Sequence, residues 1–307
     1  MRTERAASLR ADLSLVAVTA IWGFTFPAIQ FALRDAGPLS FITARFALAS
    51  LALAAIFRRR VLRLTPSGLL YSLLLGLFLS AGTILQTLGL LSTTASRSAF
   101  ITSFYVVLVP LIMLAVFRVR LRVWSLLAVP LAAAGLYLLT APAGGRLNLG
   151  DLLTLGCALA FALHIIAAEA AAPRRDPVSL AFWQVLFTAA VSALALLLFE
   201  APRFSLTPWT LTALLVTALL ATALAFAIQM WAQRETSSAH VALIFTAEPV
   251  FAALFAALLQ HERIGAKGLL GGALILVGII LSQVRARPRA ARVGRPGGGR
   301  GSRPRGG

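Results

Sequence analysis

Apolar residues occur along this chain in long continuous runs, rather than in the alternation that is typical of half-exposed strands. A helix needs roughly 20 apolar residues to cross about 30 Å of hydrocarbon. Ten runs meet this length, at 11–33, 38–57, 68–91, 95–117, 122–141, 150–171, 177–199, 208–231, 237–259 and 266–284. The connections between them are too short to hold a soluble domain. We therefore predict an all-α integral membrane protein with ten transmembrane helices.

The two halves of the chain repeat one another, at an offset of 139 residues over the first two helices and 143 afterwards. At the first offset the matching residues are Asp12, Trp22, Thr25, Pro38, Ser40 and Arg45 with Asp151, Phe161, His164, Pro177, Ser179 and Gln184. At the second they are Gln86, Thr93, Arg97, Ala99, Arg120, Leu121 and Gly135 with Gln229, Thr236, His240, Ala242, Arg263, Ile264 and Gly278. Five crossings per copy would make the second copy enter from the opposite side, as in many secondary transporters. We expect two inverted five-helix repeats, at 11–141 and 150–284, between an N-terminus at 1–10 and a tail at 285–307.

Composition agrees with a membrane protein, since 59% of residues are hydrophobic and 12% charged, and the mean hydropathy is +0.89. The first span has a counterpart at 151–171, so we expect it to stay in the mature protein rather than act as a cleaved signal peptide. The single cysteine, Cys157, lies inside a span and excludes a disulfide within the chain. The sequence contains no phosphate-binding loop and no metal-spaced Cys/His set. We expect no cofactor, no metal and no ATP drive.

Basic residues predict the orientation, because cytoplasmic loops are enriched in Lys and Arg. With the N-terminus inside, 21 basic residues fall on the cytoplasmic side and six on the other. Both termini are therefore expected in the cytoplasm, with the protein in a bacterial-type inner membrane. The tail at 285–307 is rich in Arg and Gly, and we expect it to be disordered and attracted to anionic lipid rather than to nucleic acid.

Polar side chains near the middle of a span are costly in lipid and indicate an interior or a wet site. Seven such residues occur: Arg45, Gln86, His164, Glu169, Gln184, Gln229 and Glu248. The repeat aligns Gln86 with Gln229 and Arg45 with Gln184, which favours one shared central cavity. Glu169 lies near a helix end and is left out of the core set.

Glu248 directly precedes Pro249, and a proline leaves the carbonyl one turn earlier without its helical donor. Glu248 could hold a proton or cation there, or be a neutral group bonded to a neighbouring helix, and both readings stay open. Tyr105 occupies the aligned position and would face the same cavity. Arg45 either pairs with an acidic group such as Glu248 or binds an anionic substrate. His164 could relay protons, although a lone histidine in an apolar helix is more often a packing residue.

Aromatic residues could line the same cavity and bind an organic molecule or cation through their rings. They are Trp22, Phe26, Tyr105, Trp183 and Phe245. The predicted substrate-binding residues are Trp22, Arg45, Gln86, Tyr105, His164, Trp183 and Gln229. Glu248 is the predicted residue for proton or ion coupling, and no catalytic residue is expected.

Several motifs resemble those of the EamA-type branch of the drug/metabolite transporter superfamily, from about residue 11 to 284. They are Trp22-Gly23-Phe24 with Pro27, Arg45-Phe46, Thr94-Ala95-Ser96-Arg97-Ser98-Ala99-Phe100-Ile101, Val107-Leu108-Val109-Pro110, and Glu248-Pro249-Val250 followed by Glu262. The resemblance implies a helical bundle with a central site, alternating access, and export of amino acids, metabolites or toxic compounds. The first copy has Arg118 to Arg122 where the second has Glu262, so no shared role follows for Glu262.

We therefore expect a permease or exporter of a small organic metabolite, amino acid or drug, driven by a gradient or by protons. The alternative is a carrier of a lipid-linked or other amphipathic substrate, which would need a lateral opening and arginines for a headgroup. An intramembrane enzyme would need a clustered nucleophile, acid and base, which the sequence lacks. A membrane sensor or scaffold would normally add a soluble output domain. The lipid bilayer and a small-molecule substrate are the expected partners, and assembly as a homodimer is left open.

Overall fold

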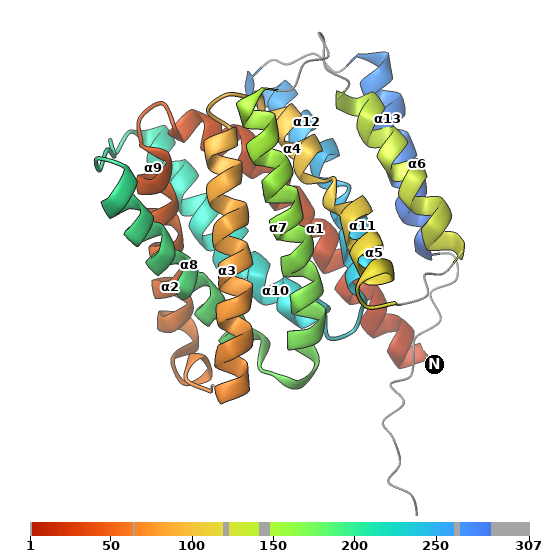
Figure 1. Cartoon of the computed structure of the whole chain (residues 1–307), viewed down its shortest axis with the longest axis horizontal. Coiled ribbons are helices and arrows are strands. Elements are labelled where there is room, and N and C mark those ends of the chain that lie inside the picture. Colours follow the sequence, from red (N-terminus) through yellow and green to blue (C-terminus); the bar gives the residue numbers. More distant parts are fainter. Residues whose placement is uncertain (1, 64, 119–122, 141–147, 261–264, 284–307) are drawn as a thin grey trace, which may run out of the picture.

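The computed structural model is a bundle of helices, and it describes residues 2–63, 65–118, 123–140, 148–260 and 265–283 (Figure 1). In chain order they are α1 (Arg2–Ala32), α2 (Pro38–Val61), α3 (Pro66–Gly89), α4 (Ala95–Thr102), α5 (Tyr105–Ala115), α6 (Val123–Thr140), α7 (Leu149–Ala171), the 3-10 turn η1 (Ala172–Arg174), α8 (Pro177–Phe199), α9 (Pro208–Leu215), the π-helical η2 (Val216–Leu224), α10 (Ala225–Ala232), α11 (Ser238–Phe245), α12 (Glu248–Gln260) and α13 (Ala266–Gln283). Within these residues β-pairing is limited to one isolated bridge, between Ala36 and Phe204. The predicted tail, Glu262 and the aligned pairs Arg120–Arg263 and Leu121–Ile264 lie outside the described residues.

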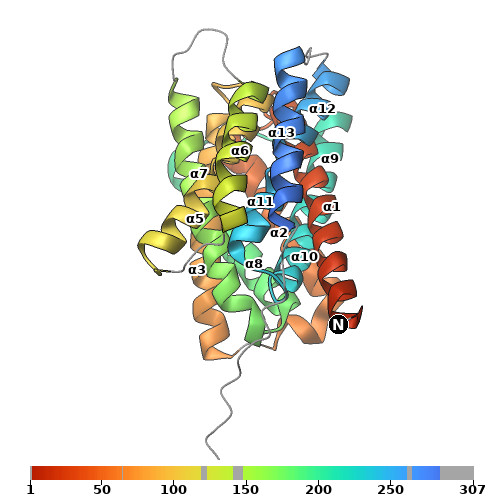
Figure 2. The same cartoon turned by 90° about the vertical axis from the view of Figure 1, so that its right-hand side faces the viewer.

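Eight helical stretches of the described chain are long and apolar enough to cross a membrane. They are Leu9–Ala32, Pro38–Val61, Pro66–Gly89, Ala95–Ala115, Leu149–Ala171, Pro177–Phe199, Pro208–Ala232 and Ser238–Leu259. The prediction of an all-helical chain with many apolar spans is confirmed to this extent. Where the fifth and tenth spans were predicted, α6 and α13 each form an 18-residue helix. These two helices run side by side at one edge of the bundle (Figure 2).

Proline marks the start of several helices, because its fixed φ suits the first turn and its missing N–H is not needed there. Pro38, Pro66, Pro177 and Pro208 each occupy the first turn of their helix. The side chain before the proline often supplies the N-cap, and Asp176 accepts from two backbone amides at the start of α8. Local sequence therefore sets these boundaries, which lie within two residues of the predicted ones.

Helices α2 and α8 form an antiparallel pair in the core. At one end, the Glu200 carboxylate that follows α8 accepts hydrogen bonds from the amides of Leu39 and Ser40, each at 2.9 Å. At the other end, Trp183 Nε1 near the start of α8 donates to the carbonyl of Val61, the last residue of α2, at 2.9 Å. Buried apolar side chains fill the space between the two helices.

Two of the predicted spans, 95–117 and 237–259, are each divided into two helices. The first is interrupted at Ser103 and Phe104 and the second at Thr246 and Ala247, which are again 143 residues apart. Pro249 has no N–H for the carbonyl of Phe245, and that carbonyl is free to bind another group. The repeat therefore extends to the positions of the two breaks.

Helix α1 approaches the second break closely. A Cβ added to Gly23 would lie 2.6 Å from Phe251 Cβ and 2.9 Å from the carbonyl oxygen of Glu248. Only glycine allows this approach without a shift of α12. The neighbouring Trp22 is thereby placed beside the start of α12.

Candidate functional site

The two helix breaks meet in the interior through Tyr105 and Glu248. Tyr105 begins α5, Glu248 begins α12, and both are buried. The Tyr105 hydroxyl oxygen lies 3.0 Å from Glu248 Oε2 and 3.1 Å from the carbonyl oxygen of Phe245. A hydroxyl group has a single hydrogen, so it can donate to only one of these two acceptors at a time. The carbonyl that Pro249 leaves free is the one that contacts Tyr105.

Trp22 lies next to this group. Its ring packs edge-on against Phe245, with ring centroids 4.8 Å apart, and is tilted against Phe226 at 5.6 Å. Trp22 Nε1 donates to the carbonyl of Ala221 at 2.8 Å, inside the π-helical segment η2. Trp22 therefore connects the breaks of the bundle to η2.

Arg45 binds the same π-helical segment and is not paired with Glu248. Its Nε donates to Thr222 Oγ1 at 2.8 Å, and the side chain of Arg45 is buried. Thr222 in turn donates to the carbonyl of Thr217 at 2.7 Å. Among the described residues no carboxylate forms an ion pair with Arg45. Of the two roles predicted for Arg45, pairing with an acidic group of the described chain is not observed.

His164 and Gln184 form a separate buried pair, with Nε2 of His164 2.7 Å from Oε1 of Gln184. The ring of His164 packs edge-on against Phe226 at 5.8 Å. Arg45 and Gln184 each lie seven residues after the start of their helix, α2 or α8. Because α2 and α8 are antiparallel, these aligned residues lie toward opposite ends of the bundle rather than at one depth.

The two aligned glutamines also have different partners. Gln86 Nε2 donates to Thr102 Oγ1 at 3.3 Å, next to the buried Cys157. Gln229 Nε2 donates to Gln233 Oε1 at 2.9 Å, and Gln229 Oε1 has no hydrogen-bond partner among the described residues. The structure therefore distributes the predicted polar residues over several buried pairs.

Trp183 is not brought together with the other aromatic residues of the predicted site. Its indole N–H binds Val61 at the end of α2, and its ring packs edge-on against Phe182 at 5.3 Å. Phe26 belongs to another part of the core, which is buried beside Phe41. Trp22, Tyr105 and Phe245 are the predicted aromatic residues that the structure groups together.

Two side-chain pairs at opposite ends of the bundle, an arginine–aspartate ion pair and a histidine–aspartate contact, involve residues that were not predicted as site residues. Arg97 Nη2 lies 2.7 Å from Asp151 Oδ2, and His240 Nε2 lies 3.0 Å from Asp12 Oδ1. We call Arg97–Asp151 and His240–Asp12 the end pairs. The alignment at offsets 139 and 143 already matched Asp12 with Asp151 and Arg97 with His240. These two alignments are the sequence signal from which the end pairs could have been predicted.

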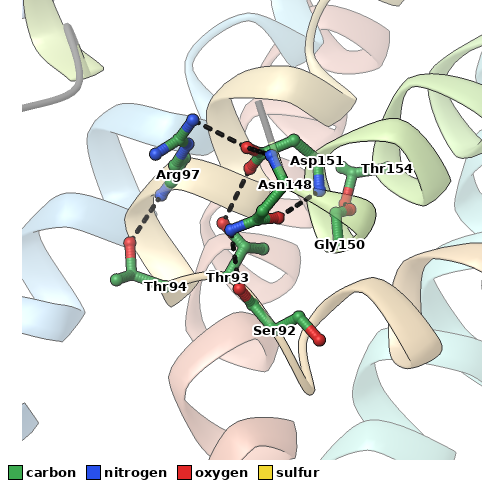
Figure 3. Close-up of polar contacts among 8 residues, drawn as sticks. All are labelled: Ser92, Thr93, Thr94, Arg97, Asn148, Gly150, Asp151 and Thr154. Carbon is green, nitrogen blue, oxygen red and sulfur yellow. Dashed lines mark hydrogen bonds and ion pairs between the residues drawn. The ribbon is translucent and has the colours of Figure 1, made fainter. Parts of the chain in front are cut away.

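The surroundings of the two end pairs differ in burial. Figure 3 shows that the Asp151 carboxylate binds Arg97, Thr93 Oγ1 at 3.0 Å and the backbone N–H of Asn148 at 2.8 Å. The Asp151 side chain is wholly buried, whereas that of Asp12 is 14% exposed. The Arg97–Asp151 pair is thus the more strongly bound of the two.

The start of α11 is held by another acidic side chain. Glu169 Oε2 accepts from the amide of Ser238 at 2.8 Å. The residue aligned with Glu169 is Gln30, which donates to the carbonyl of Thr93 at 3.1 Å, just before α4. Glu169, which was left out of the core set, therefore binds the first half of a broken span.

These features define a class of protein: a helical membrane protein whose broken spans meet at buried polar side chains. The sequence model of the EamA-like transporter family matches residues 9–141 and again 148–283. The chain belongs to this family, as its motifs indicated, and is a multi-pass membrane transporter.

Relatives in distant organisms agree with this assignment. The chain is 34% identical to an "Uncharacterized transporter" of Archaeoglobus fulgidus, over 92% of this chain and 88% of the relative. It is 24% identical to the "Uncharacterized transporter YoaV" of Bacillus subtilis, over 89% of this chain and 97% of the relative. The crystal structure of a protein 19% identical to this chain superposes with a TM-score of 0.73, over 91% of this chain and 96% of the other. That likeness shows a shared fold.

Proposed function

We propose that this protein is a secondary transporter that moves a small organic metabolite, amino acid or drug across a bacterial-type inner membrane by alternating access. The supporting observation is that a contact between the two halves, Asp12 with His240, recurs between the aligned residues, Asp151 with Arg97, with the halves exchanged. Transporters built from inverted repeats have two halves that take equivalent conformations on opposite sides of the membrane. Aligned contacts at opposite ends of the bundle are what such an arrangement requires.

The end pairs supply the first correspondence. Each joins the first helix of one copy to the first half of a broken span: Asp12 on α1 to His240 on α11, and Asp151 on α7 to Arg97 on α4. The helix caps correspond as well, because the side chain of Thr94 caps α4 and that of Ser237 caps α11. In this proposal α6 and α13 complete two inverted five-helix repeats, at 11–141 and 150–284.

Tyr105 and Glu248 supply the second correspondence, since these two residues are aligned with each other and also in contact. When equivalent positions of two copies touch, the contact lies near the twofold axis that relates them. We place the pseudo-twofold axis of the repeats at this contact. A change at Glu248 would then act on both halves of the bundle.

The end pairs are the gates of this transport cycle. The distribution of basic residues supports an orientation with the termini and the His240–Asp12 pair at the cytoplasmic face, and Arg97–Asp151 at the other face. Opening toward one face separates the end pair there, while the other pair stays formed. Substrate therefore meets one open gate at a time.

Glu248 couples the cycle to protons in this proposal. When Glu248 carries a proton, its O–H donates to the Tyr105 hydroxyl, which then donates to the carbonyl of Phe245. When Glu248 is ionised, the Tyr105 hydrogen is directed to the carboxylate and the Phe245 carbonyl loses its donor. Proton release would thus rearrange the contact between the two halves. The substrate-binding residues in this proposal are six of the seven predicted from the sequence: Trp22, Arg45, Gln86, Tyr105, His164 and Gln229. The seventh, Trp183, is left out because its N–H binds Val61 at the end of α2.

A thermal-shift screen of small organic molecules on the purified protein, followed by counterflow of each stabilising compound in proteoliposomes, tests transport. We expect at least one stabilising compound to exchange across the bilayer. If none exchanges, the transport proposal fails. Counterflow at two pH gradients then tests coupling. Glu248→Gln should keep exchange and lose accumulation driven by the pH gradient, whereas Glu235→Gln, at an exposed position, should keep both. An unchanged pH response in Glu248→Gln would remove Glu248 from the coupling.

A further inference from the structure

The guanidinium group of Arg45 is a buried cation without a counter-ion in the described part of the chain. Only 7% of Arg45 is exposed. Within the described residues, it forms a hydrogen bond from Nε to Thr222 Oγ1 and lies over the ring of the adjacent Phe46, whose centroid is 5.3 Å from the guanidinium carbon. An uncompensated charge inside a membrane protein is costly, and such groups usually mark a ligand or ion site.

The hydrogen bond to Thr222 fixes the orientation of this cation. The Thr222 hydrogen is used in the bond to the Thr217 carbonyl, so its oxygen is available as an acceptor for Arg45 Nε. Thr217 and Thr222 belong to η2, and π-helical segments are frequent at functional sites. The four N–H donors on Nη1 and Nη2 have no hydrogen-bond partner among the described residues. This edge of a guanidinium matches the two oxygens of a carboxylate.

The surroundings of Arg45 favour an organic anion over an inorganic one. Trp22 Nε1 binds Ala221, the residue next to Thr222, which brings the indole ring near the same turn of η2. The indole also packs against Phe226 and Phe245. An apolar body could lie against these rings while its anionic end meets Arg45. The aligned position in the second copy is the neutral Gln184, which binds His164, so the anion site belongs to one half of the bundle.

We propose that Arg45, oriented by Thr222, binds the carboxylate of a small organic anion whose apolar part lies against Trp22. This inference rests on the proposed transport function and names its substrate class. The charge of Arg45 is compensated by the substrate when the site is filled. A molecule of the same shape without the negative charge is bound much more weakly.

The test measures thermal shifts of the purified protein with aromatic and aliphatic monocarboxylates, with their neutral amides, and with inorganic phosphate. We expect carboxylates to stabilise the protein and the amides to lose at least tenfold in apparent affinity, the loss expected for a charge-assisted pair. Arg45→Gln should abolish the carboxylate effect, and Arg34→Gln, which removes an exposed arginine, should leave it unchanged. Equal binding of amides and carboxylates, or an unchanged effect in Arg45→Gln, would overturn the proposal.

Variants at Thr222 keep the test decisive if Arg45→Gln does not fold. Thr222→Ser retains the hydroxyl that orients Arg45 and should bind carboxylates normally. Thr222→Val keeps the size and removes the acceptor, and should weaken carboxylate binding several-fold, with little change for the amides. Equal carboxylate affinity in the two variants would show that Thr222 does not orient the site.

Two further measurements separate the alternatives. In nanodiscs, phosphatidylglycerol alone could stabilise the protein in a way that depends on Arg45, with no added effect of carboxylates. This result would identify a lipid headgroup as the occupant and overturn the proposal. In counterflow, uncharged compounds exchanged equally by wild type and Arg45→Gln would overturn the anion site and leave transport intact. Carboxylate binding at Arg45 without exchange of any compound would support the site and refute transport.

Discussion

Asp151→Asn should destabilise the protein much more than the aligned substitution Asp12→Asn. The Asp151 carboxylate is wholly buried and binds Arg97, Thr93 and the amide of Asn148. Breaking a fully buried ion pair costs about 3–5 kcal/mol. The Arg97 side chain is 21% exposed, so solvent screening lowers the expected loss to about 2–3 kcal/mol. Asp12 and His240 are partly exposed, and a pair of this kind contributes about 0.5–1 kcal/mol.

Cys157 offers a direct assay of this difference. It is the only cysteine of the chain and is fully buried, so a thiol-reactive fluorophore labels the protein as it unfolds. At roughly 2 °C per kcal/mol for a chain of this size, we expect Tm to fall by about 5 °C in Asp151→Asn and by about 1–2 °C in Asp12→Asn. Cys157→Ser provides the background control for labelling.

A double-mutant cycle shows whether the loss comes from the ion pair. Combining Asp151→Asn with Arg97→Gln should cost less than the sum of the two single variants, with a coupling of about 1 kcal/mol or more. Equal Tm losses in Asp12→Asn and Asp151→Asn, or additive losses in the cycle, would contradict this prediction. The two end pairs would then not differ in the way their burial indicates.

Three other predictions follow from single contacts. Gly82→Ala should lower the free energy of unfolding by about 1–3 kcal/mol, because its Cβ would lie 2.3 Å from an aromatic ring of α7. Gly156→Ala, whose nearest new contact is at 3.2 Å, should lower it by less than about 1 kcal/mol. Thermal unfolding checks both. Trp183→Phe should lower Tm slightly by removing one hydrogen bond and leave substrate affinity unchanged, while Trp22→Phe should weaken binding in the same thermal-shift titration. Tyr105→Phe should retain exchange and reduce accumulation driven by a pH gradient, and unaltered accumulation would exclude its hydroxyl from coupling.

The helices and their ends are largely predictable because local sequence determines them. Apolar run length identifies the spans, and residues such as Pro177 and Pro208 define where helices start. The breaks are less visible, since Ser103 and Phe104 lie in an apolar run whose proline, Pro110, comes later. The contact between Tyr105 and Glu248 also lies at these breaks. Local sequence does not determine it, because it joins residues 143 positions apart.

The partners of the candidate site residues could not be predicted, because they depend on packing between distant helices. Arg45 binds Thr222, a residue that the apolar sequence of its span does not distinguish from other threonines. Trp183 was grouped with the interior aromatics by residue type, yet its depth in α8 places its N–H at the end of α2. Alignment of the two halves identifies equivalent positions. Because α2 and α8 pack antiparallel, such positions need not be neighbours in the structure.

The chemical differences between the halves bear on the proposed cycle. If aligned residues were identical, the conformations open to the two faces would have equal energy, apart from the membrane potential and the solutes on each side. Here Arg97 is aligned with His240, and Arg97 binds a wholly buried Asp151, whereas His240 binds a partly exposed Asp12. In the proposed cycle, the stronger pair would oppose opening at its own face when the site is empty. On this argument the empty transporter opens preferentially at the His240 face, and the empty-state preference should shift toward the Arg97 face in Asp151→Asn.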